Sequence, residues 1–291
     1  MSGEWTIGII GGSGIYDLAG LEDAQWIAVG SPWGEPSDEI LCGRLGGIAL
    51  RFLPRHGRGH RVAPGDINAR ANIDALKRAG CTDILAVAAV GSLNEDLPPG
   101  SAVLAEQFID QTKGRPASFF GTGMVAHVSM AEPTCPRLSQ ATAVALAKAG
   151  GRVRTGATYL AVEGPQFSTR AESRLYRQWG ADVVGMTAMP EARLAREAEL
   201  PYALLALVTD WDSWNEEEPP VAVEQVVAQL AANGKLARDA IANLPAALPR
   251  YREESPIDYA LQDAIITAPD AQDAELRLKL GAVARRVFEG Y

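Results

Sequence analysis

The sequence predicts an α/β fold in a single domain. Short apolar runs alternate along the chain with segments of helical periodicity, which is the pattern of α/β architecture. The chain has 291 residues, enough for one sizeable core, and its 47% hydrophobic and 22% charged residues are ordinary for a globular protein. We find neither an internal repeat nor a segment with the composition of a linker, so one domain is the simpler prediction.

Strands dominate the first half of the chain. Residues 5–10 are apolar enough for a buried strand and end in Gly11-Gly-Ser-Gly14, and strand-like pieces broken by glycine and proline follow between residues 25 and 54. Residues 68–79 have helix-forming composition and stop at a glycine, a favoured C-terminal cap. The run over residues 84–90 then predicts a second buried strand.

Helices dominate the second half. Residues 137–149 predict an Ala-rich helix, and Thr169-Arg-Ala-Glu172 is a capping box that opens another. Apolar residues keep helical spacing over residues 223–244, where a proline stops the pattern. The charged tail that follows carries one further predicted helix over residues 272–288.

Charge and cysteine content narrow the class of protein. The net charge of -9 and the pI near 5.0 argue against broad attraction to nucleic acid or to an anionic membrane. Cys42, Cys81 and Cys135 are widely spaced and form no C-x-x-C pattern, so we interpret them as reduced core or loop residues. We find neither a signal peptide nor a run of membrane-spanning length, and we therefore expect a cytoplasmic protein.

Two aspartates at the end of a predicted strand are the first candidates for chemistry. Asp210 and Asp212 follow the apolar run over residues 202–208. Ligands bind outside the carboxyl ends of strands in open α/β sheets, and residues two apart on an extended chain point to the same side. Both carboxylates can therefore face one ligand. A pair of solvated loop acids, or a helix cap, is the alternative for this feature taken alone.

Two glycine-rich segments are candidates for an anion site. Gly11-Gly-Ser-Gly14 lacks the last glycine of a dinucleotide fingerprint and the Lys-Ser/Thr of a Walker sequence, and its N–H groups suit either a free phosphate or a tight turn. In Pro54-Arg-His-Gly-Arg-Gly-His60 the glycines disfavour a helix, so a metal-binding pair of histidines is not expected. An arginine held between glycines fits bidentate phosphate recognition better.

Two further segments deliver side chains to strand ends. In Glu163-Gly-Pro-Gln-Phe-Ser168, an exposed Phe167 on a Gly-Pro turn suits stacking against a flat ring, with core packing as the alternative. Gly185-Met-Thr187 follows a short strand-like piece and brings a hydroxyl. The chain has no G-x-S-x-G elbow, no H-E-x-x-H and no cysteine with obvious activation, so covalent and metal chemistry are disfavoured.

Together these motifs resemble those of the 5′-methylthioadenosine phosphorylases, within the trimeric purine nucleoside phosphorylase family. They occur in the family's order and spacing from about residue 6 to residue 245. The motifs are Gly11-Gly-Ser-Gly14, Arg55-His-Gly-Arg-Gly-His60, Gly91-Ser-Leu93, Met130-Ala-Glu-Pro133, Glu163-Gly-Pro-Gln-Phe-Ser168, Met186-Thr187 and Thr209-Asp-Trp-Asp212. The resemblance implies a mixed central β-sheet flanked by helices, with a catalytic domain over residues 1–250 and a C-terminal helical extension of the same domain over residues 251–291.

The resemblance also implies a reaction and a set of site residues. Inorganic phosphate, as co-substrate of an enzyme without a cofactor, would attack 5′-methylthioadenosine and release adenine and 5-methylthioribose 1-phosphate. Phosphate would lie among Ser13, Arg55, His56 (through its backbone N–H), Ala89 and Thr187. Phe167 and Met186 would hold base and ribose, and Thr209, Asp210 and Asp212 would address the purine edge. Val223, Val226, Val227 and His127 would line the methylthio pocket, with His127 reaching a neighbouring subunit's site in a homotrimer.

One position departs from the family. Ala88 stands where related enzymes often present a threonine hydroxyl to phosphate, and the loss of one such hydrogen bond costs about 1 kcal/mol.

The chemistry assigns different roles to the two acids. The purine leaves with negative charge, which a proton at N7 neutralises, and an aspartate can give that proton only if its pKa rises from about 3.9 towards 7. Burial beside a second carboxylate raises a pKa in this way. We expect Asp210 to be the acid and Asp212 to recognise the 6-amino group.

Two alternatives stay open. The nearer one is a phosphorylase of 6-oxopurine nucleosides such as methylthioinosine or inosine, but that branch typically carries asparagine where Asp210 stands. The remoter one is a non-catalytic nucleotide-binding protein with a Rossmann-like fold, which would use the loop over residues 11–14. At the 5′ position the apolar valines favour methylthio over hydroxyl.

Overall fold

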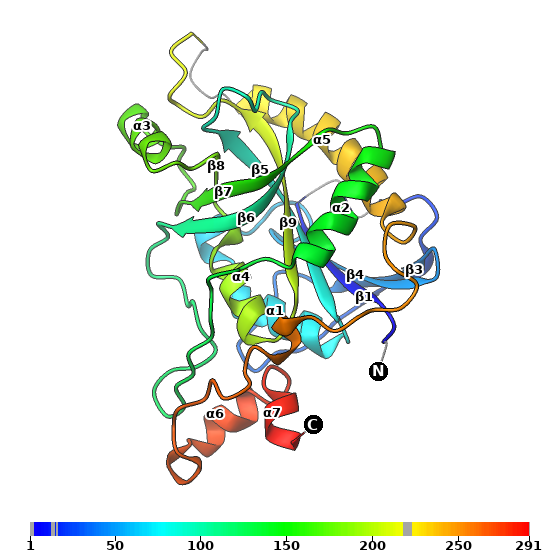
Figure 1. Cartoon of the computed structure of the whole chain (residues 1–291), viewed down its shortest axis with the longest axis vertical. Helices are drawn as coiled ribbons and strands as arrows, with labels where there is room; N and C mark the ends of the chain where they lie inside the picture. The colour runs from blue at the N-terminus through cyan, green and yellow to red at the C-terminus, as the bar shows by residue number, and fades with distance from the viewer. Residues whose placement is uncertain (1–2, 13–14, 16, 218–222, 291) are drawn as a thin grey trace.

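The computed structural model describes residues 3–12, 15, 17–217 and 223–290, and its strands join one mixed nine-stranded sheet (Figure 1). The strands are β1 (Thr6–Gly11), β2 (Glu22–Ile27), β3 (Ile40–Leu45), β4 (Ile48–Pro54), β5 (Asp83–Ser92), β6 (Ala102–Asp110), β7 (Val153–Ala161), β8 (Val183–Gly185) and β9 (Tyr202–Asp210). The helices are α1 (Ala69–Arg78), α2 (Pro136–Lys148), α3 (Arg170–Gln178), α4 (Ala188–Glu197), α5 (Val223–Asn243), α6 (Ala274–Lys279) and α7 (Arg285–Glu289), with short 3₁₀ turns η1 (Pro64–Asp66), η2 (Pro256–Tyr259) and η3 (Pro269–Ala271).

β5 organises the sheet because it pairs with three other strands. Residues 83–86 lie parallel to β1, residues 84–91 lie parallel to β9, and residues 91–92 pair antiparallel with β8. β9, β6, β7 and β8 are joined in turn, so these four strands and β5 close into a ring. One edge of β5 pairs with β1 over residues 83–86 and with β8 over residues 91–92. Residues 87–90 pair with neither strand along that edge, which is called the open edge below.

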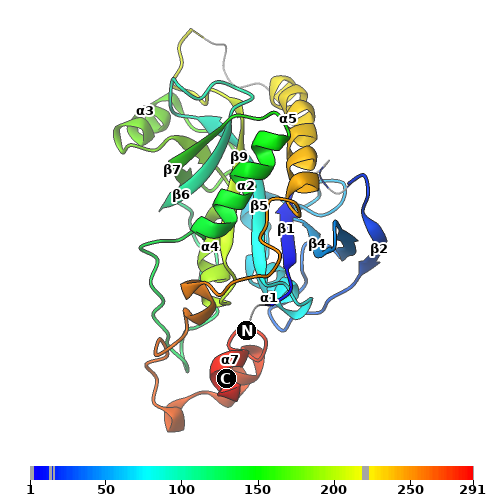
Figure 2. The ribbon, with the colours of Figure 1, turned by 45° about the vertical axis from the view of Figure 1, so that its right-hand side comes forward.

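Helices cover both faces of the sheet. α2 and α5 pack together against one face, and α1 packs with α4 on the other (Figures 1 and 2). Leu85 and Val87 of β5 belong to the core under α2 and α5, whereas Ala86 and Ala88 belong to the core under α1 and α4. This alternation is the period of two that a strand imposes on its side chains. The predicted α/β fold, one domain with a mixed sheet flanked by helices, is confirmed.

The predicted capping box is confirmed, because Thr169 and Glu172 make both of its bonds at the start of α3. At the start of α1, Asn68 accepts from the backbone N–H of Ala71, a cap that was not predicted. β6 and β7 had no counterpart in the prediction, because polar residues interrupt the apolar pattern in each.

The single helix predicted over residues 272–288 is wrong. Two short helices stand there, α6 and α7, separated by a turn in which the Gly281 N–H donates to the carbonyl of Leu278. Glycine has low helix propensity, and the buried Leu280 and Val283 pack on the body of the protein instead of continuing one apolar stripe.

Residues 118–130 and 260–290 form a protrusion, called the arm below, at the end of the molecule away from the tip of β9 (Figure 1). The two stretches are paired: Ala126 and Ile265 form an antiparallel bridge, and the backbone N–H of Asp273 donates to the carbonyl of Gly123. Among the described residues, no helix is both long and apolar enough to cross a membrane.

Two acids at the end of α4 fasten the arm to the body. Glu197 accepts 2.7 Å hydrogen bonds from the Ser118 hydroxyl and the Phe119 N–H, which hold the first stretch of the arm. Glu199 accepts from the Leu261 N–H at 2.9 Å and from Arg286 Nη2 at 2.6 Å, which hold the second. The arm is therefore attached to the C-terminal end of α4, the helix that follows Thr187.

Candidate active site

The open edge of β5 is the first part of the site. The N–H of Ile84 donates to Pro201 on the β9 side, whereas the carbonyl of Val87 accepts from Arg55 Nη1 on the other side at 2.8 Å. Residues of a parallel strand turn their backbone groups to alternate edges, so Ala89 faces the same edge as Val87. No described strand pairs with that edge at Ala89, and its side chain is exposed although β5 is central. Ala89 therefore presents its backbone N–H to an open space.

Arg55 lies beside this edge in a buried network. Its Nε and Nη2 donate to the Glu191 carboxylate at 2.9 and 3.0 Å, and Glu191 also accepts from the Tyr202 hydroxyl at 2.8 Å. The Arg55 side chain is only 2% exposed, and the Nε and Nη2 atoms that could bind an anion side by side are bound to Glu191. One Nη1 hydrogen is left after the bond to Val87. The sequence had no signal for Glu191, because this residue lies 136 positions further along the chain.

The arginine held between glycines does not lie in the site. Arg58 binds Asp38 at 2.7 Å and Glu39 at 2.8 Å on the surface. The predicted bidentate phosphate recognition by an arginine between glycines is therefore wrong, because Nε and Nη2 of Arg58 donate to these two acids instead.

His56 offers its backbone instead of its charge. Its ring stacks on His60 with 4.4 Å between the ring centroids, and its Nδ1 lies 2.9 Å from the carbonyl of Val62. Burial lowers the pKa of His56 to about 4, so the ring is neutral near neutral pH. The backbone N–H of His56 has no acceptor among the residues that the structure describes. Among all residues that the structure describes, no group of three or more His, Cys, Asp or Glu side chains is placed to hold a metal ion.

Thr187 brings a hydroxyl to the same strand ends from the start of α4. Its backbone N–H donates to the Tyr159 hydroxyl at 3.3 Å. A Cβ atom on Gly185 would lie 2.1 Å from that hydroxyl, which explains the glycine at the end of β8. The half-buried Thr187 side chain makes no capping bond to α4, and it lies within hydrogen-bonding reach of the Tyr159 hydroxyl, whose pKa it helps to lower. Ser13, the remaining predicted phosphate residue, lies outside the described residues.

The two aspartates meet through a turn. Asp210 ends β9, but Asp212 has a left-handed backbone with φ of 52°, so the expected extended spacing is wrong. The N–H of Asp212 donates to Asp210 Oδ1 at 2.8 Å, and the Thr209 hydroxyl donates to Asp210 Oδ2 at 2.7 Å. Both acids nevertheless lie beside β5: a Cβ atom on Gly91 would lie 3.0 Å from Asp210 Oδ1 and 3.1 Å from Asp212 Cβ.

Burial raises the pKa of Asp210, as the sequence predicted, and it raises the pKa of Asp212 as well. For Asp210 the loss of hydration outweighs the hydrogen bonds from Thr209 and from the Asp212 backbone, which lower its pKa. For Asp212 the loss of hydration is again the largest cause, and the charge of Asp210 raises its pKa further. A carboxyl with a raised pKa is the kind of group that can carry a proton for general acid catalysis.

The buried Oδ2 atom of Asp212 has no hydrogen-bond partner among the described residues. The Ser173 and Ser168 side chains and the backbone of Ser213 lie close enough to the Asp212 carboxylate to lower its pKa. A buried carboxylate oxygen left without a donor costs about 1–3 kcal/mol or more, so such an atom points to a ligand that donates.

The two predicted base-binding side chains lie on neighbouring segments. Phe167 is exposed, and the Ser213 hydroxyl donates to the carbonyl of Ser168 at 2.7 Å, which ties its segment to the loop after the aspartates. Met186 packs on Gly164, where a Cβ atom would lie 2.4 Å from Met186 Sδ. The segment of Phe167 is thus tied to the loop that carries Asp212, and Met186 packs against the turn that leads to Phe167.

The predicted methylthio residues are only partly brought together. Val226 is half-buried and Val227 is 58% exposed near the start of α5, while the side chain of Val223 lies outside the description. His127 is exposed on the arm, where its N–H donates to the carbonyl of Ala264 at 3.0 Å. The arm lies at the opposite end of the molecule from the start of α5 (Figure 1), so the fold does not bring His127 to the site of its own chain.

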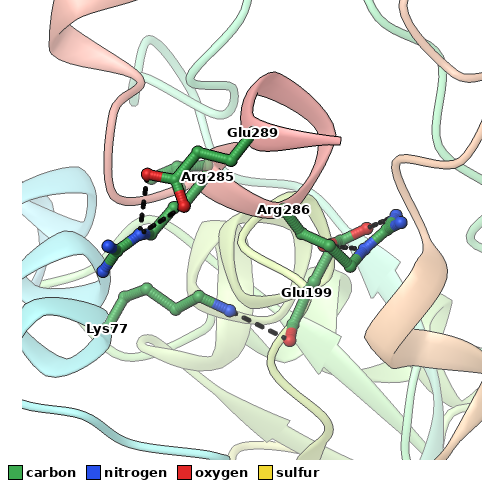
Figure 3. Close-up of a pocket in the computed structure, with 6 residues that line it drawn as sticks. Lys77, Glu199, Arg285, Arg286 and Glu289 are labelled. Atoms are coloured by element: carbon green, nitrogen blue, oxygen red, sulfur yellow. Dashed lines mark hydrogen bonds and ion pairs between the residues drawn. The ribbon is translucent and has the colours of Figure 1, made fainter. Parts of the chain in front are cut away.

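A cavity of about 440 Å³ lies elsewhere, between α7, α1 and the turn after α4 (Figure 3). It is lined by Lys77, Glu199, Val283, Arg285, Arg286 and Glu289. Its charges are largely paired within the wall, Arg285 with Glu289 and Arg286 with Glu199. The cavity shares no residue with the strand-end site.

Comparison with known proteins agrees with this geometry. Residues 6–244 match the model of the phosphorylase superfamily. The chain is 54% identical to the S-methyl-5′-thioadenosine phosphorylase of Cereibacter sphaeroides, over 98% of this chain and 99% of that protein, and 55% identical to that of Rhodospirillum rubrum, over 97% of each. Among solved structures, a methylthioadenosine phosphorylase from an antarctic soil metagenomic library superposes with a TM-score of 0.86 at 44% identity, covering 96% of this chain and 99% of that one. The methylthioadenosine phosphorylase of Schistosoma mansoni in complex with adenine superposes with a TM-score of 0.83 at 36% identity, covering 90% and 99%. The motif resemblance is thereby confirmed, and the chain belongs to the phosphorylase superfamily.

Proposed function

We propose that the chain cleaves 5′-methylthioadenosine with inorganic phosphate, giving adenine and 5-methylthioribose 1-phosphate. A phosphate oxygen bonds to C1′ of the ribose as the bond from C1′ to N9 breaks. The electron pair of that bond passes to the purine, and a proton from Asp210 neutralises it at N7. The identity to S-methyl-5′-thioadenosine phosphorylases over nearly the whole chain supports this reaction.

One observation carries the mechanistic part of the proposal. The open N–H edge of β5 at Ala89 lies two residues before Gly91, where the buried aspartates with raised pKa approach the same strand. The end of β5 therefore has an anion site at Ala89 and a proton donor, Asp210, beside Gly91. Phosphorolysis of a nucleoside needs both, because positive charge develops on the sugar and negative charge on the base.

Phosphate binding relies on N–H dipoles and hydroxyls more than on net charge. The charge of Arg55 is already compensated by Glu191, and the ring of His56 is neutral. The donors proposed for phosphate are the backbone N–H groups of His56 and Ala89, the last Nη1 hydrogen of Arg55 and the Thr187 hydroxyl, with Ser13 expected from the family pattern. Ala88 adds none.

The pair of acids favours an adenine over a 6-oxopurine. The unpartnered Oδ2 of Asp212 is an acceptor when ionised, and the 6-amino group of adenine can donate to it. A 6-oxo group would bring a second acceptor to the same atom. Sites built for one hydrogen-bonding pattern can reject the other by up to about 10⁴-fold.

The methylthio group is assigned to the apolar surface at the start of α5, where Val226 and Val227 lie. An apolar wall prefers a methylthio group to a hydroxyl by about 1–3 kcal/mol.

The exposed arm is accounted for by a homotrimer. Ile266 is 63% exposed and Leu278 is 79% exposed on the arm, large apolar side chains that a neighbouring copy would cover. In this assembly His127 of the partner subunit reaches the 5′ end of the bound nucleoside. Sedimentation velocity is expected to give a species of three chains, and a fully active monomer would contradict the assignment.

A comparison of four nucleosides tests the reaction. Base release is measured from methylthioadenosine, methylthioinosine, adenosine and inosine, each with and without phosphate. The expected result is strictly phosphate-dependent release that is fastest with methylthioadenosine. Faster release from methylthioinosine would favour the 6-oxopurine enzyme. Tight NAD binding without any base release would instead indicate a nucleotide-binding protein with no phosphorolytic activity.

A further inference from the structure

We propose that Arg115 and Glu163 are positioning residues of the active site. Their ion pair holds the segment of Met186 and Thr187 against the segment that leads to Phe167, in the geometry that binds nucleoside and phosphate together. The inference rests on the proposed phosphorolysis and adds two residues to it. Neither side chain belongs to the sets assigned above to phosphate, base or ribose.

The hydrogen bonds of Arg115 all end on those two segments. Nε donates to Glu163 Oε1 at 2.9 Å and Nη2 donates to the carbonyl of Glu163 at 2.6 Å. Nη1 donates to the carbonyls of Met186 at 2.8 Å and Met189 at 2.9 Å. Four of the five N–H groups of the guanidinium are thus used, and its side chain is only 6% exposed. Bonds from a charged donor are about twice as strong as neutral ones.

The bond to Met186 matters because it fixes a peptide group that belongs to the site. The carbonyl of Met186 and the N–H of Thr187 lie in one planar peptide unit. Arg115 holds the carbonyl, and the Tyr159 hydroxyl accepts from the N–H at 3.3 Å. The peptide is clamped at both ends, so the direction in which the Met186 and Thr187 side chains leave the backbone is set by these two contacts.

Glu163 completes the clamp from the other segment. Its Oε2 accepts from the backbone N–H of Lys113, so the carboxylate holds both the guanidinium and the turn that carries it. The neighbouring Gly164 has a left-handed φ of 67° and leaves room for Met186, which a Cβ atom there would strike at 2.4 Å. Loss of the ion pair would let these two packed segments separate.

The central test is Arg115→Met, which keeps an apolar stem of similar length and removes the donors. The expected result is a 10- to 100-fold fall in kcat/KM for both methylthioadenosine and phosphate, mostly through higher KM, at temperatures where circular dichroism shows a folded protein. Arg193→Met is the matched control. Arg193 lies on α4, the helix that follows Thr187. It is partly exposed and pairs with Asp110 at 3.1 Å, so its loss should leave both constants unchanged.

Chemical rescue separates positioning from stability. In Arg115→Ala, added guanidinium at low millimolar concentration should restore activity at least severalfold and saturably, while methylammonium of the same charge should not, because only the planar ion can bridge several carbonyls. If Arg115→Met does not fold, Arg115→Lys and Glu163→Gln take its place, each with an expected loss of about 3- to 10-fold.

Hydrogen exchange gives a readout that does not depend on the reaction. The Thr187 amide is expected to exchange at least tenfold faster in Arg115→Met than in the wild type or in Arg193→Met. Unchanged exchange, or kcat/KM within twofold of wild type for both substrates, would overturn the assignment. A wild-type protein without phosphorolysis would refute the proposed function alone, and the exchange rates would still decide the role of Arg115.

Discussion

Replacement of Asp210 by asparagine is the sharpest test of the proposed chemistry, because the structure predicts that activity and stability respond in opposite ways. Asparagine has nearly the same shape as aspartate. Its Oδ1 can accept from the Asp212 N–H, and its Nδ2 can donate to the Thr209 hydroxyl, which has free lone pairs. The local hydrogen bonds survive, and only the proton source is removed.

The expected loss of turnover is large. General acid catalysis contributes about 10²- to 10⁴-fold, which corresponds to about 2.7–5.4 kcal/mol of transition-state stabilisation. In the wild type, activity should fall as the pH rises through the raised pKa of Asp210, because the acid must be protonated. That limb of the pH profile should be absent from Asp210→Asn.

Stability should not fall with activity. Burial raises the pKa of Asp210 in the folded state, so ionisation disfavours the fold as the pH rises from the unfolded pKa through the folded one. Above that window the wild type bears the cost of a buried charge, and the neutral amide does not. The Tm of Asp210→Asn near neutral pH is therefore expected to equal or exceed that of the wild type.

The assay is the release of adenine from methylthioadenosine at saturating phosphate, with methylthioinosine measured in parallel. The amide of asparagine can donate to a 6-oxopurine, so activity on methylthioinosine should fall less than activity on methylthioadenosine. A variant with near-normal kcat/KM for methylthioadenosine would refute the role of Asp210 as the acid. A variant that loses activity only because its Tm has collapsed would refute the structural reasoning.

Three other perturbations probe the phosphate side. The pKa of His56 is lowered to about 4 in the folded protein, so the unfolded chain binds the proton at higher pH than the folded chain does. The free energy of unfolding should therefore decrease as the pH falls from about 6.5 to about 4, and urea melts of His56→Gln should show a smaller decrease. Ala88→Thr adds a hydroxyl on the α1 and α4 face of β5, one residue before Ala89, and should lower the KM for phosphate about fivefold, the equivalent of about 1 kcal/mol; an unchanged KM would contradict the placement of phosphate. Gly185→Ala puts a Cβ atom 2.1 Å from the Tyr159 hydroxyl, so thermal unfolding should show a loss of about 1–3 kcal/mol together with a higher KM for phosphate, and an unaltered Tm would mean that the ring moves freely.

Features that depend on neighbours in the sequence could be predicted. The capping box of Thr169 and Glu172 involves four consecutive residues, and the continuous apolar run of β9 is a local property, so both were predicted correctly from the sequence. The same locality placed Asp210 at the end of a strand. Local reasoning was wrong after the end of β9, because it assumed an extended chain where Asp212 has a left-handed backbone.

Features that depend on distant partners could not be predicted. The sequence shows an arginine at position 55, but only the fold brings Glu191 against it, and this contact decides that Arg55 enters the site with its charge compensated. Arg115 gave no signal at all, since its acceptors, the Glu163 carboxylate and three backbone carbonyls, lie 48 to 74 positions away.

The sequence by itself determined the α/β class, the order of the motifs and the family, because these follow from periodicity and from residue types at short spacing. The tertiary structure alone decided which backbone edge stays open, which charges are already paired and how far each carboxyl is buried. Those properties set the pKa of Asp210 and the donors available to phosphate, and they arise from desolvation and pairing between segments that are far apart in the chain.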